Sequence, residues 1–280
     1  MEYINYNGKI LEANKVLIGA NSRGLRYGDG LFETIKSREG ELLFAEDHFQ
    51  RLWDGLELLQ FRIPALLTKE KLQDDIHALL QKNKHNKLAR VRLIMLRGNG
   101  GLYDEINHHP DYIIQTWSLP DNAGQWNSNG LTMGIYTDAR KTRDHFSNLK
   151  HNNFLPYVMA ALQAKKQKWN DALVLNDAGR VCDSSIANIF LVKNETISTV
   201  ALEEGCIAGV MRKQVIRLLA ENNINVQETA VPVEELLNAD EVFLSNSIFN
   251  IRWVQSIGDK RYSNRVIQKI YSDIFSTILQ

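Results

Sequence analysis

Apolar residues alternate with polar ones over several short stretches of the first 119 residues, a pattern that predicts strands. Asn7-Gly8 lies between the first two of these stretches and is typical of a tight β-hairpin turn. The strands expected in this part are Tyr3–Tyr6, Lys9–Leu11, Val16–Ala20, Leu31–Ser37, Leu42–Phe44, Ala89–Leu96 and Tyr112–Ser118. Helical spacing of apolar residues predicts helices over Glu46–Leu59 and Lys69–Lys84, and Thr68 is expected to cap the second.

Residues 120–130 are polar, rich in Gly and Asn, and without periodicity, so we interpret them as a linker. This divides the chain into an N-terminal domain of residues 1–119 and a C-terminal domain of residues 131–280. The strands expected in the second domain are Leu131–Thr137, Ala172–Asn176, Arg180–Cys182, Ile224–Glu228 and Glu241–Ser245, with two more around Ile189 and Ile197. One helix is expected after Phe154 and ends near Lys168. Three more are expected over Lys213–Asn222, Val233–Leu237 and Arg265–Leu279. Strands that alternate with helices in this way predict an α/β fold.

The 280-residue chain carries 33 basic and 33 acidic residues, so its net charge offers no case for nucleic acid or a membrane surface as partner. The N-terminus has no signal-peptide pattern, and no apolar run reaches the length of a membrane span. Cys182 and Cys206 form no CxxC motif, which favours reduced thiols and a cytoplasmic location. The histidines show no metal-binding spacing, so no metal site is expected.

The most distinctive chemistry lies between Asp183 and Arg212. Asp183 precedes a short apolar strand, and Gly209-Val210-Met211 opens a helix after a glycine-containing turn. The first backbone N–H groups of a helix lack partners within it and can bind an anion such as a phosphate. An ordinary strand–loop–helix connection explains the same residues on local grounds.

This stretch resembles the signature of the class IV aminotransferases, the fold-type IV pyridoxal-phosphate enzymes. The matching motifs, all in family order, are Asn188-Ile189-Phe190, Ile197-x-Thr199 and Ile207-x-Gly209-Val210-x-Arg212. Asp183 departs from the pattern, because the family usually has Glu there. The resemblance implies a two-domain α/β (α+β) fold, with a smaller N-terminal domain, a larger C-terminal domain and pyridoxal 5′-phosphate between them. It also implies a homodimer.

The resemblance assigns a role to several residues around the cofactor. Lys150, in a Lys-x-x-Asn setting upstream of the acidic residue, corresponds to the Schiff-base lysine. Asp183 corresponds to the carboxylate that pairs with the pyridinium nitrogen, although Asp is one methylene shorter than Glu, roughly 1.5 Å of reach. The phosphate ligands implied are Arg51 of a His-x-x-Arg-Leu motif, the N–H groups of Val210 and Met211, and Ser247.

Substrate-binding candidates lie in the N-terminal domain. Tyr27 begins a Tyr-Gly-Asp-Gly-x-Phe-Glu-Thr segment similar to the one that lines the substrate side in the family. Arg92, on an alternating strand, is the candidate ligand for the substrate carboxylate, and Arg97 is the nearby alternative; a solvent-facing Arg92 is an equal local interpretation. The domain boundary predicts Arg51 and Arg92 on one wall of an interdomain cleft and Lys150 on the other.

We therefore expect a pyridoxal-phosphate-dependent aminotransferase of the branched-chain or D-amino-acid type, acting on an amino acid and a 2-oxo acid. The alternative is aminodeoxychorismate lyase, which releases pyruvate and 4-aminobenzoate from aminodeoxychorismate. Tyr27-Gly28-Asp29-Gly30 favours the lyase and D-amino-acid branches, whereas Leu102 stands where some lyases carry Arg. A third hypothesis, motivated by Asp183, is a catalytically inactive family member.

Overall fold

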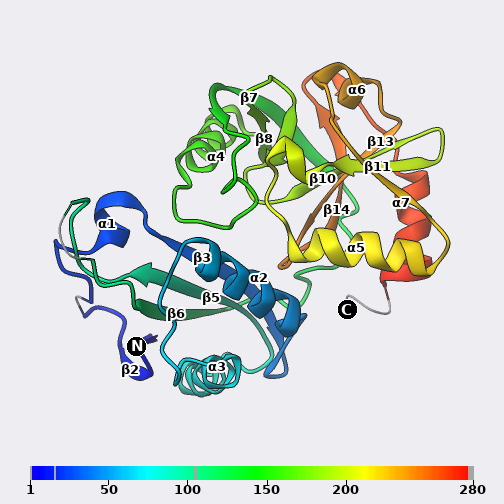
Figure 1. The fold of residues 1–280 in the computed structure, drawn as a ribbon. Helices are drawn as coiled ribbons and strands as arrows, with labels where there is room; N and C mark the ends of the chain where they lie inside the picture. Colours follow the sequence, from blue (N-terminus) through cyan, green and yellow to red (C-terminus); the bar gives the residue numbers. More distant parts are fainter. Residues whose placement is uncertain (1, 16, 104–105, 277–280) are drawn as a thin grey trace. The chain divides into compact units, whose positions relative to one another are not determined.

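The computed structural model describes residues 2–15, 17–103 and 106–276 and divides the chain into two compact units (Figure 1). Unit 1 comprises Met1–Ala123 and Leu149–Asn153, and unit 2 comprises Gly124–Asn148 and Phe154–Gln280. The chain first passes between units within residues 120–130, where the sequence predicts a linker. Leu149–Asn153 differ from the prediction, because they belong to unit 1 rather than to the C-terminal domain.

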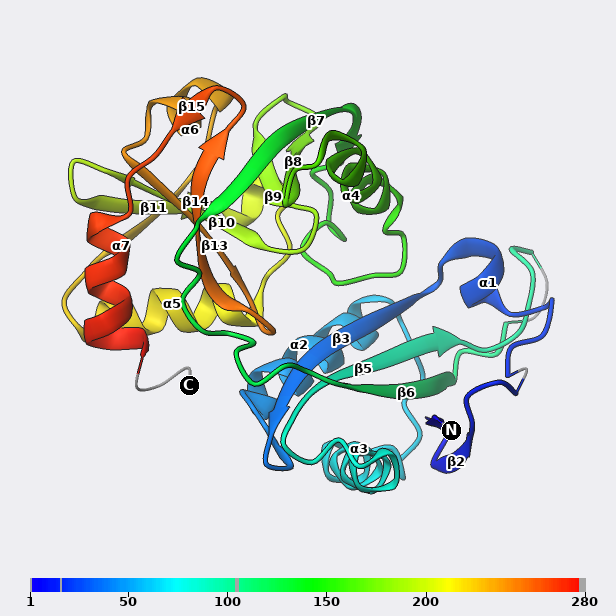
Figure 2. The same cartoon turned by 180° about the vertical axis from the view of Figure 1, so that it is seen from behind.

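The described residues of unit 1 form a six-stranded antiparallel sheet with the order β2-β1-β6-β5-β3-β4. Its strands are β1 (Tyr3–Tyr6), β2 (Lys9–Glu12), β3 (Gly30–Arg38), β4 (Glu41–Leu42), β5 (Leu88–Arg97) and β6 (Pro110–Ser118). The predicted N-terminal hairpin is confirmed: Tyr6 pairs with Lys9, and both Asn7 and Gly8 adopt positive φ. In Figure 2, β3, β5 and β6 run side by side.

Two helices, α2 (Ala45–Leu58) and α3 (Lys69–Asn83), cover one face of this sheet. Their buried residues form one core with Ile35, Val91 and Leu93 of the strands. The predicted alternation on β5 is confirmed, since Val91, Leu93 and Met95 are buried whereas Arg90 and Arg92 lie on the opposite, partly exposed face. The Thr68 cap is also confirmed, because its hydroxyl accepts a hydrogen bond from Lys71 N at 3.1 Å.

The segment before β3 differs from the sequence-based expectation. Arg23–Tyr27, for which no element is predicted, forms a short helix, α1, with Ser22 accepting from Leu25 N and Gly28 ending it in the left-handed region. The strand expected over Val16–Ala20 is wrong for residues 17–20, which form no strand, and Val16 lies outside the described residues. β4 is only two residues long, because Phe44 takes a positive φ that ends the strand.

The described part of unit 2 is built on a nine-stranded mixed sheet with the order β12-β11-β10-β13-β14-β7-β8-β9, and β15 pairs with β14. The strands are β7 (Leu131–Lys141), β8 (Asp171–Asn176), β9 (Val181–Ser184), β10 (Asn188–Lys193), β11 (Thr196–Val200), β12 (Val226–Thr229), β13 (Glu241–Asn246), β14 (Asn250–Ile257) and β15 (Lys260–Arg261). The last two strands have no counterpart in the sequence-based prediction.

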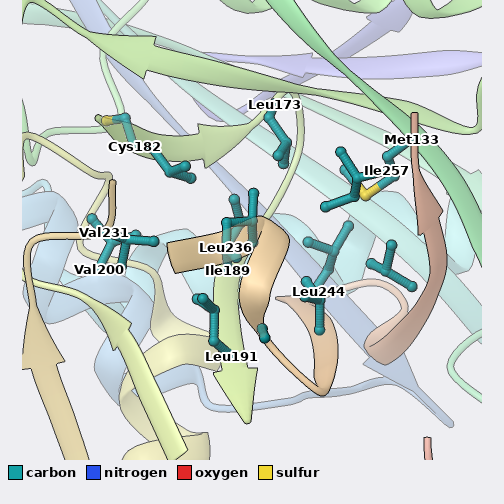
Figure 3. Packing of buried hydrophobic residues seen from close by; sticks show 14 of the residues in the cluster. Met133, Leu173, Cys182, Ile189, Leu191, Val200, Val231, Leu236, Leu244 and Ile257 are labelled. Carbon is teal, nitrogen blue, oxygen red and sulfur yellow. The ribbon is translucent and has the colours of Figure 1, made fainter. Parts of the chain in front are cut away.

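Apolar side chains from β7 to β14 meet on one face of this sheet and form the main core of unit 2, in which Met133, Leu173, Ile189 and Leu244 are buried (Figure 3). The opposite face of β7 and β8 is covered by α4 (Leu155–Gln167). The remaining helices are α5 (Val210–Glu221), α6 (Val233–Asn238) and α7 (Arg265–Ile270). The final helix is predicted to reach Leu279; α7 passes into a wider π-helical turn over Tyr271–Phe275, and residues 277–280 lie outside the described residues.

Membrane-spanning helices and metal-binding clusters are both absent from the described residues. None of the helices there combines the length and the apolar character that crossing a bilayer requires. The same residues contain no group of three or more His, Cys, Asp or Glu side chains that could hold a metal ion.

The segment Leu149–Asn153 is attached to the edge of β3 by backbone pairing. Phe32 N donates to Lys150 O and Asn152 N donates to Gly30 O, both at 2.9 Å, and Leu31 and His151 form an antiparallel bridge. Gly30 permits this close approach, because a Cβ there would lie 2.1 Å from the backbone oxygen of Met95 and 2.8 Å from the side-chain Nδ2 atom of Asn152. The backbone of Lys150 is thereby fixed beside β3.

We expect Gly30→Ala to destabilise the protein by about 1–3 kcal/mol, because the added methyl group meets backbone that cannot move without breaking the sheet. The change in unfolding free energy is measured by chemical denaturation. Gly19→Ala is the matched control, since a Cβ at Gly19 has no atom within 4 Å. Equal stabilities of the two variants would contradict this account of the β3 edge.

Candidate active site

A buried carboxylate joins β3 to α2 in unit 1. Glu33 is almost fully buried, and its oxygens accept from Arg51 Nε at 2.8 Å and Arg51 Nη2 at 2.5 Å. The second of these oxygens also lies 2.6 Å from His48 Nδ1. His48 and Arg51 are three residues apart on α2, so both side chains reach the same point on the strand. The Arg51 fork is thus held in one orientation.

The protonation states of this cluster follow from burial and from the Arg51 charge. Burial alone would raise the pKa of Glu33, but Arg51 and then His48 lower this pKa to about 2. Burial lowers the pKa of His48, and the Glu33 charge only partly opposes that effect. At neutral pH we therefore describe Glu33 as an anion paired with Arg51, and His48 as a neutral ring that donates to it.

Lys150 and Arg92 both contact the ring of Phe32. The Lys150 Nζ atom lies 4.5 Å from the ring centroid, and the Arg92 Cζ atom lies 4.2 Å from it. All three residues belong to unit 1, so the expectation that Arg92 and Lys150 line opposite domains is wrong. A primary amine and a guanidinium are brought to one aromatic side chain.

The same face of the sheet carries two more cations. Lys36 pairs in register with Arg90, and Thr34 with Arg92, which puts these side chains on the face that Phe32 occupies. Burial, with Arg38 nearby, lowers the pKa of Lys36 to about 8, and burial also lowers the pKa of Arg90 and of Arg92. The Arg90 Nε atom is buried without a hydrogen-bond partner among the described residues. Such a face favours an anion.

Arg97 and Tyr27, the other substrate-side candidates, lie elsewhere in unit 1. The guanidinium of Arg97 is held by Asp29 at 2.9 Å, by the carbonyl oxygens of Leu59 and Gln60, and by His108. Its three nitrogens therefore all have protein partners. Tyr27 ends α1, with the Arg23 guanidinium 5.2 Å from its ring centroid. The Arg97 guanidinium also packs on the Phe61 ring, with its Cζ atom 4.0 Å from the centroid.

A second buried carboxylate, Asp183, lies within β9 of unit 2. It accepts hydrogen bonds from Tyr157 Oη at 2.6 Å, Asn188 Nδ2 at 2.9 Å and Ile207 N at 3.0 Å. Lys141 Nζ lies 3.5 Å away, a distance that makes it an ion-pair partner rather than a well-formed hydrogen-bond donor. Although Asp is shorter than the usual Glu, this carboxylate has polar neighbours at both oxygens.

Burial raises the pKa of Asp183, while Lys141, Tyr157 and the Ile207 N–H act to lower it. The Cys182 thiol is 3.8 Å from the carboxylate, and burial raises its pKa well above the ordinary value. A thiol in that state is a poor nucleophile, in agreement with the absence of a nucleophilic motif around Cys182. Of Cys182 and Asp183, Asp183 is therefore the residue whose charge can act on a bound ligand.

The α5 N-terminus supplies backbone donors near this carboxylate network. Gly209 is its N-cap, and the first intrahelical bond runs from Lys213 N to Gly209 O, so the N–H groups of Val210 and Met211 precede the helical ladder. A Cβ on Gly209 would lie 1.9 Å from Asn188 Oδ1, and Asn188 donates in turn to Asp183. The same Asn residue thus connects the helix start to the buried carboxylate.

Ser247 lies in the turn between β13 and β14. Asn246 Oδ1 shapes this turn by accepting from Ile248 N and Phe249 N, at 3.0 and 2.8 Å. Within unit 2 the structure brings Asp183, Asn188 and the start of α5 into one network, while Lys150, Arg51 and Arg92 belong to unit 1. The contacts of Lys141 and Tyr157 with Asp183 carry no sequence signal, since one residue ends a strand and the other lies within a helix.

Comparisons with known proteins give one family. The family described as "Amino-transferase class IV" matches residues 30–257. A Methanocaldococcus jannaschii protein with the provisional name branched-chain-amino-acid aminotransferase is 30% identical over 270 residues, covering 95% of this chain and 92% of its own length. Aminodeoxychorismate lyase of Vibrio harveyi is 30% identical over 237 residues, covering 84% and 85%.

The fold is also similar to a solved structure, the branched-chain aminotransferase of Thermoproteus uzoniensis with norvaline. The TM-score is 0.86 at 22% identity, and the match covers 99% of this chain and 95% of that one. At this identity the likeness shows the fold alone. The predicted fold class, a mixed α/β structure of fold-type IV, is confirmed.

The Glu33–Arg51 pair predicts a pH-dependent contribution to stability. Because the pKa of Glu33 is lowered from 4.5 to about 2, its stabilisation is present above pH 4.5 and is lost as the pH falls toward 2. We expect Glu33→Gln to lower the unfolding free energy at neutral pH by on the order of 3 kcal/mol, and the deficit to shrink below pH 4.5.

Denaturant titrations of wild type and variant at several pH values measure this difference. Glu57→Gln, which removes the same charge at an exposed position of α2, serves as the control and should show no such trend. A Glu33→Gln deficit that stays constant as the solution is acidified would rule out a charged Glu33 as the source.

Proposed function

Because this chain belongs to the class IV aminotransferase family, we propose that it is a pyridoxal-phosphate-dependent aminotransferase of the branched-chain or D-amino-acid type. In this proposal it moves an amino group from an amino acid to a 2-oxo acid. The observation that carries the proposal is the pair of cationic side chains on the Phe32 ring, the Lys150 amine and the Arg92 guanidinium. Transamination needs an amine that moves a proton at the substrate Cα and a cation that holds the substrate carboxylate.

The residues present fit pyridoxal 5′-phosphate by their chemistry. The phosphate group requires N–H and O–H donors, which Val210 N, Met211 N and Ser247 supply. Glu33 orients the Arg51 guanidinium, which we assign to the phosphate as a charged hydrogen-bond donor. The ring nitrogen requires a carboxylate, and Asp183 is a buried one.

When bound, the cofactor supplies an electron-accepting ring, and the protein supplies attachment, orientation and proton transfer. Lys150 would hold the cofactor through its amine, and as a free amine it would act as the base at the substrate Cα. The backbone hydrogen bond from Phe32 N to Lys150 O limits where that amine can reach. Asp183 would hold a proton on the ring nitrogen; Lys141 and Tyr157 oppose the burial that raises the pKa of Asp183, and the positive charge of the protonated ring would favour its charged form.

The second candidate function is that of aminodeoxychorismate lyase. One observation favours it: Lys36, Arg90 and Arg92 lie on one face of the sheet in unit 1, and a substrate with two carboxylates would use more than one of them. Arg97, the alternative carboxylate ligand, is less suited in either case because its nitrogens already bind protein atoms. Tyr27 is proposed to lie on the side of the site that binds the substrate.

We also propose an oligomeric state and a cellular compartment for this protein. We infer a homodimer from the family, and small-molecule substrates rather than nucleic acid or a membrane as partners. Cys182 and Cys206 are both unpaired and buried, which supports a reducing compartment such as the cytoplasm.

An amine-donor panel on full-length protein supplied with pyridoxal phosphate tests the function. We expect branched-chain or D-amino acids to convert the bound cofactor to its amine form, with 2-oxo acid appearing in equal amount. Lys150→Ala should abolish this conversion, whereas Lys166→Ala, an exposed lysine at the end of α4, should not.

The other outcomes separate the remaining hypotheses. Pyruvate and 4-aminobenzoate from aminodeoxychorismate, with no response to any amino acid, would establish the lyase instead. Cofactor binding without either reaction would favour the inactive family member that Asp183 raises as a hypothesis.

Arg92→Gln should raise the KM for every carboxylate substrate roughly 10- to 100-fold, since a charged hydrogen bond to the substrate is lost. Steady-state kinetics measure this, with Arg62→Gln, at a residue outside the cationic face, as the matched control. An unchanged KM in Arg92→Gln would remove Arg92 from the substrate site.

A further inference from the structure

Unit 2 contains a small pocket of about 100 Å³ that the proposed function does not use. This volume has room for several waters or for a small organic molecule. The residues that line it come from β7, β8, β13, β14 and the turns beside them: Leu131, Asn170, Asp171, Ile186, Ala187, Leu244, Asn246, Phe249, Asn250 and Arg252. All of them belong to unit 2, so the pocket is formed within one compact unit.

Asp171 provides a buried acid on the wall of this pocket. It is 97% buried, and its Oδ1 atom accepts from Ser185 Oγ at 2.5 Å and from Ala172 N at 2.8 Å. Its Oδ2 atom is buried and has no hydrogen-bond partner among the described residues. Burial raises the pKa of Asp171, against the effect of its hydrogen bonds, so a cation beside Oδ2 would restore the charged form. An unsatisfied buried carboxylate oxygen of this kind requires a donor.

Arg252 provides a cation on the same pocket. Its guanidinium lies 5.0 Å from the ring centroid of Phe249, and burial lowers the pKa of Arg252. Within residues 2–15, 17–103 and 106–276, no carboxylate lies within ion-pair distance of it. A half-buried guanidinium without a counterion favours a planar anion such as a carboxylate.

We propose that this pocket binds a small free α-amino acid as a zwitterion, with its ammonium group on Asp171 Oδ2 and its carboxylate on Arg252. An α-amino acid carries an ammonium and a carboxylate group on the same carbon atom, which matches one acid and one base on a single small pocket. Leu131, Leu244 and Phe249 then contact a short aliphatic side chain.

This site is distinct from the Asp183 network. Tyr157, Lys141, Asn188 and Ile207, the partners of Asp183, do not line the pocket. The two sites are nevertheless neighbours along the chain. Ser185, whose hydroxyl donates to Asp171, follows Asp183 of β9 by two residues. The pocket is therefore a second ligand site that shares none of the residues assigned to the cofactor.

Isothermal titration calorimetry with glycine and L-alanine tests the proposal on wild-type protein and on Lys150→Ala. We expect one weak pocket site per chain, present with equal affinity in both proteins, because the pocket is independent of the proposed attachment lysine; a further site in wild type alone would be the site of transamination. Asp171→Asn and Arg252→Gln should each weaken binding about tenfold or more. Asp259→Asn and Arg261→Gln, at exposed positions of unit 2 outside the pocket, should not change it.

Three probes check the chemistry of recognition. Acetate and methylamine each offer one charge, and betaine keeps both charges but has no N–H donor for Asp171. We expect all three to bind more weakly than glycine. Betaine or acetate binding as tightly as glycine, heat that disappears in Lys150→Ala, or affinity that is unchanged in both pocket variants would each overturn the proposal.

Discussion

The pairing of residues 149–153 with the edge of β3 is the constraint on which the arrangement of unit 1 depends. Two backbone hydrogen bonds and one bridge hold a segment that is more than a hundred residues away in sequence. They align the Lys150 amine with the Phe32 ring, and Phe32 is one residue from Glu33. A strand edge thus carries the lysine, while the opposite neighbour of β3, β5, carries Arg92. The backbone of Lys150 is thus positioned by pairing with a sheet.

Two buried carboxylates show how differently one chemical group behaves in two environments. Glu33 has a guanidinium at hydrogen-bond distance, so its charge is stabilised and the pKa falls despite burial. Asp183 has an ammonium at 3.5 Å and otherwise neutral donors, so burial prevails and the pKa rises. Glu33 is suited to hold a neighbouring cation in place at any ordinary pH. Asp183 is suited to a partner that brings a positive charge of its own.

Local signals were sufficient for most elements and for the pattern of β5. The Asn7-Gly8 turn, the Thr68 cap and the alternation of Val91 with Arg92 each depend on neighbouring residues, and the structure confirms them. What local signals could not provide is contact between distant segments. The docking of Lys150 on β3 and the approach of Lys141 to Asp183 follow from tertiary packing alone. α1 was missed because its glycine suggests a loop, while Ser22 and Gly28 cap a single turn.

Both cysteines of the chain lie in unit 2, and both thiols are buried with raised pKa values, that of Cys206 at about 12. Reaction with an alkylating reagent requires a thiolate that solvent can reach. In the native state neither condition is met, so labelling occurs only in molecules in which the core of unit 2 has opened. Unit 1 contributes no thiol to that signal. The rate at which these thiols are labelled therefore measures the local opening of unit 2, and no probe has to be introduced.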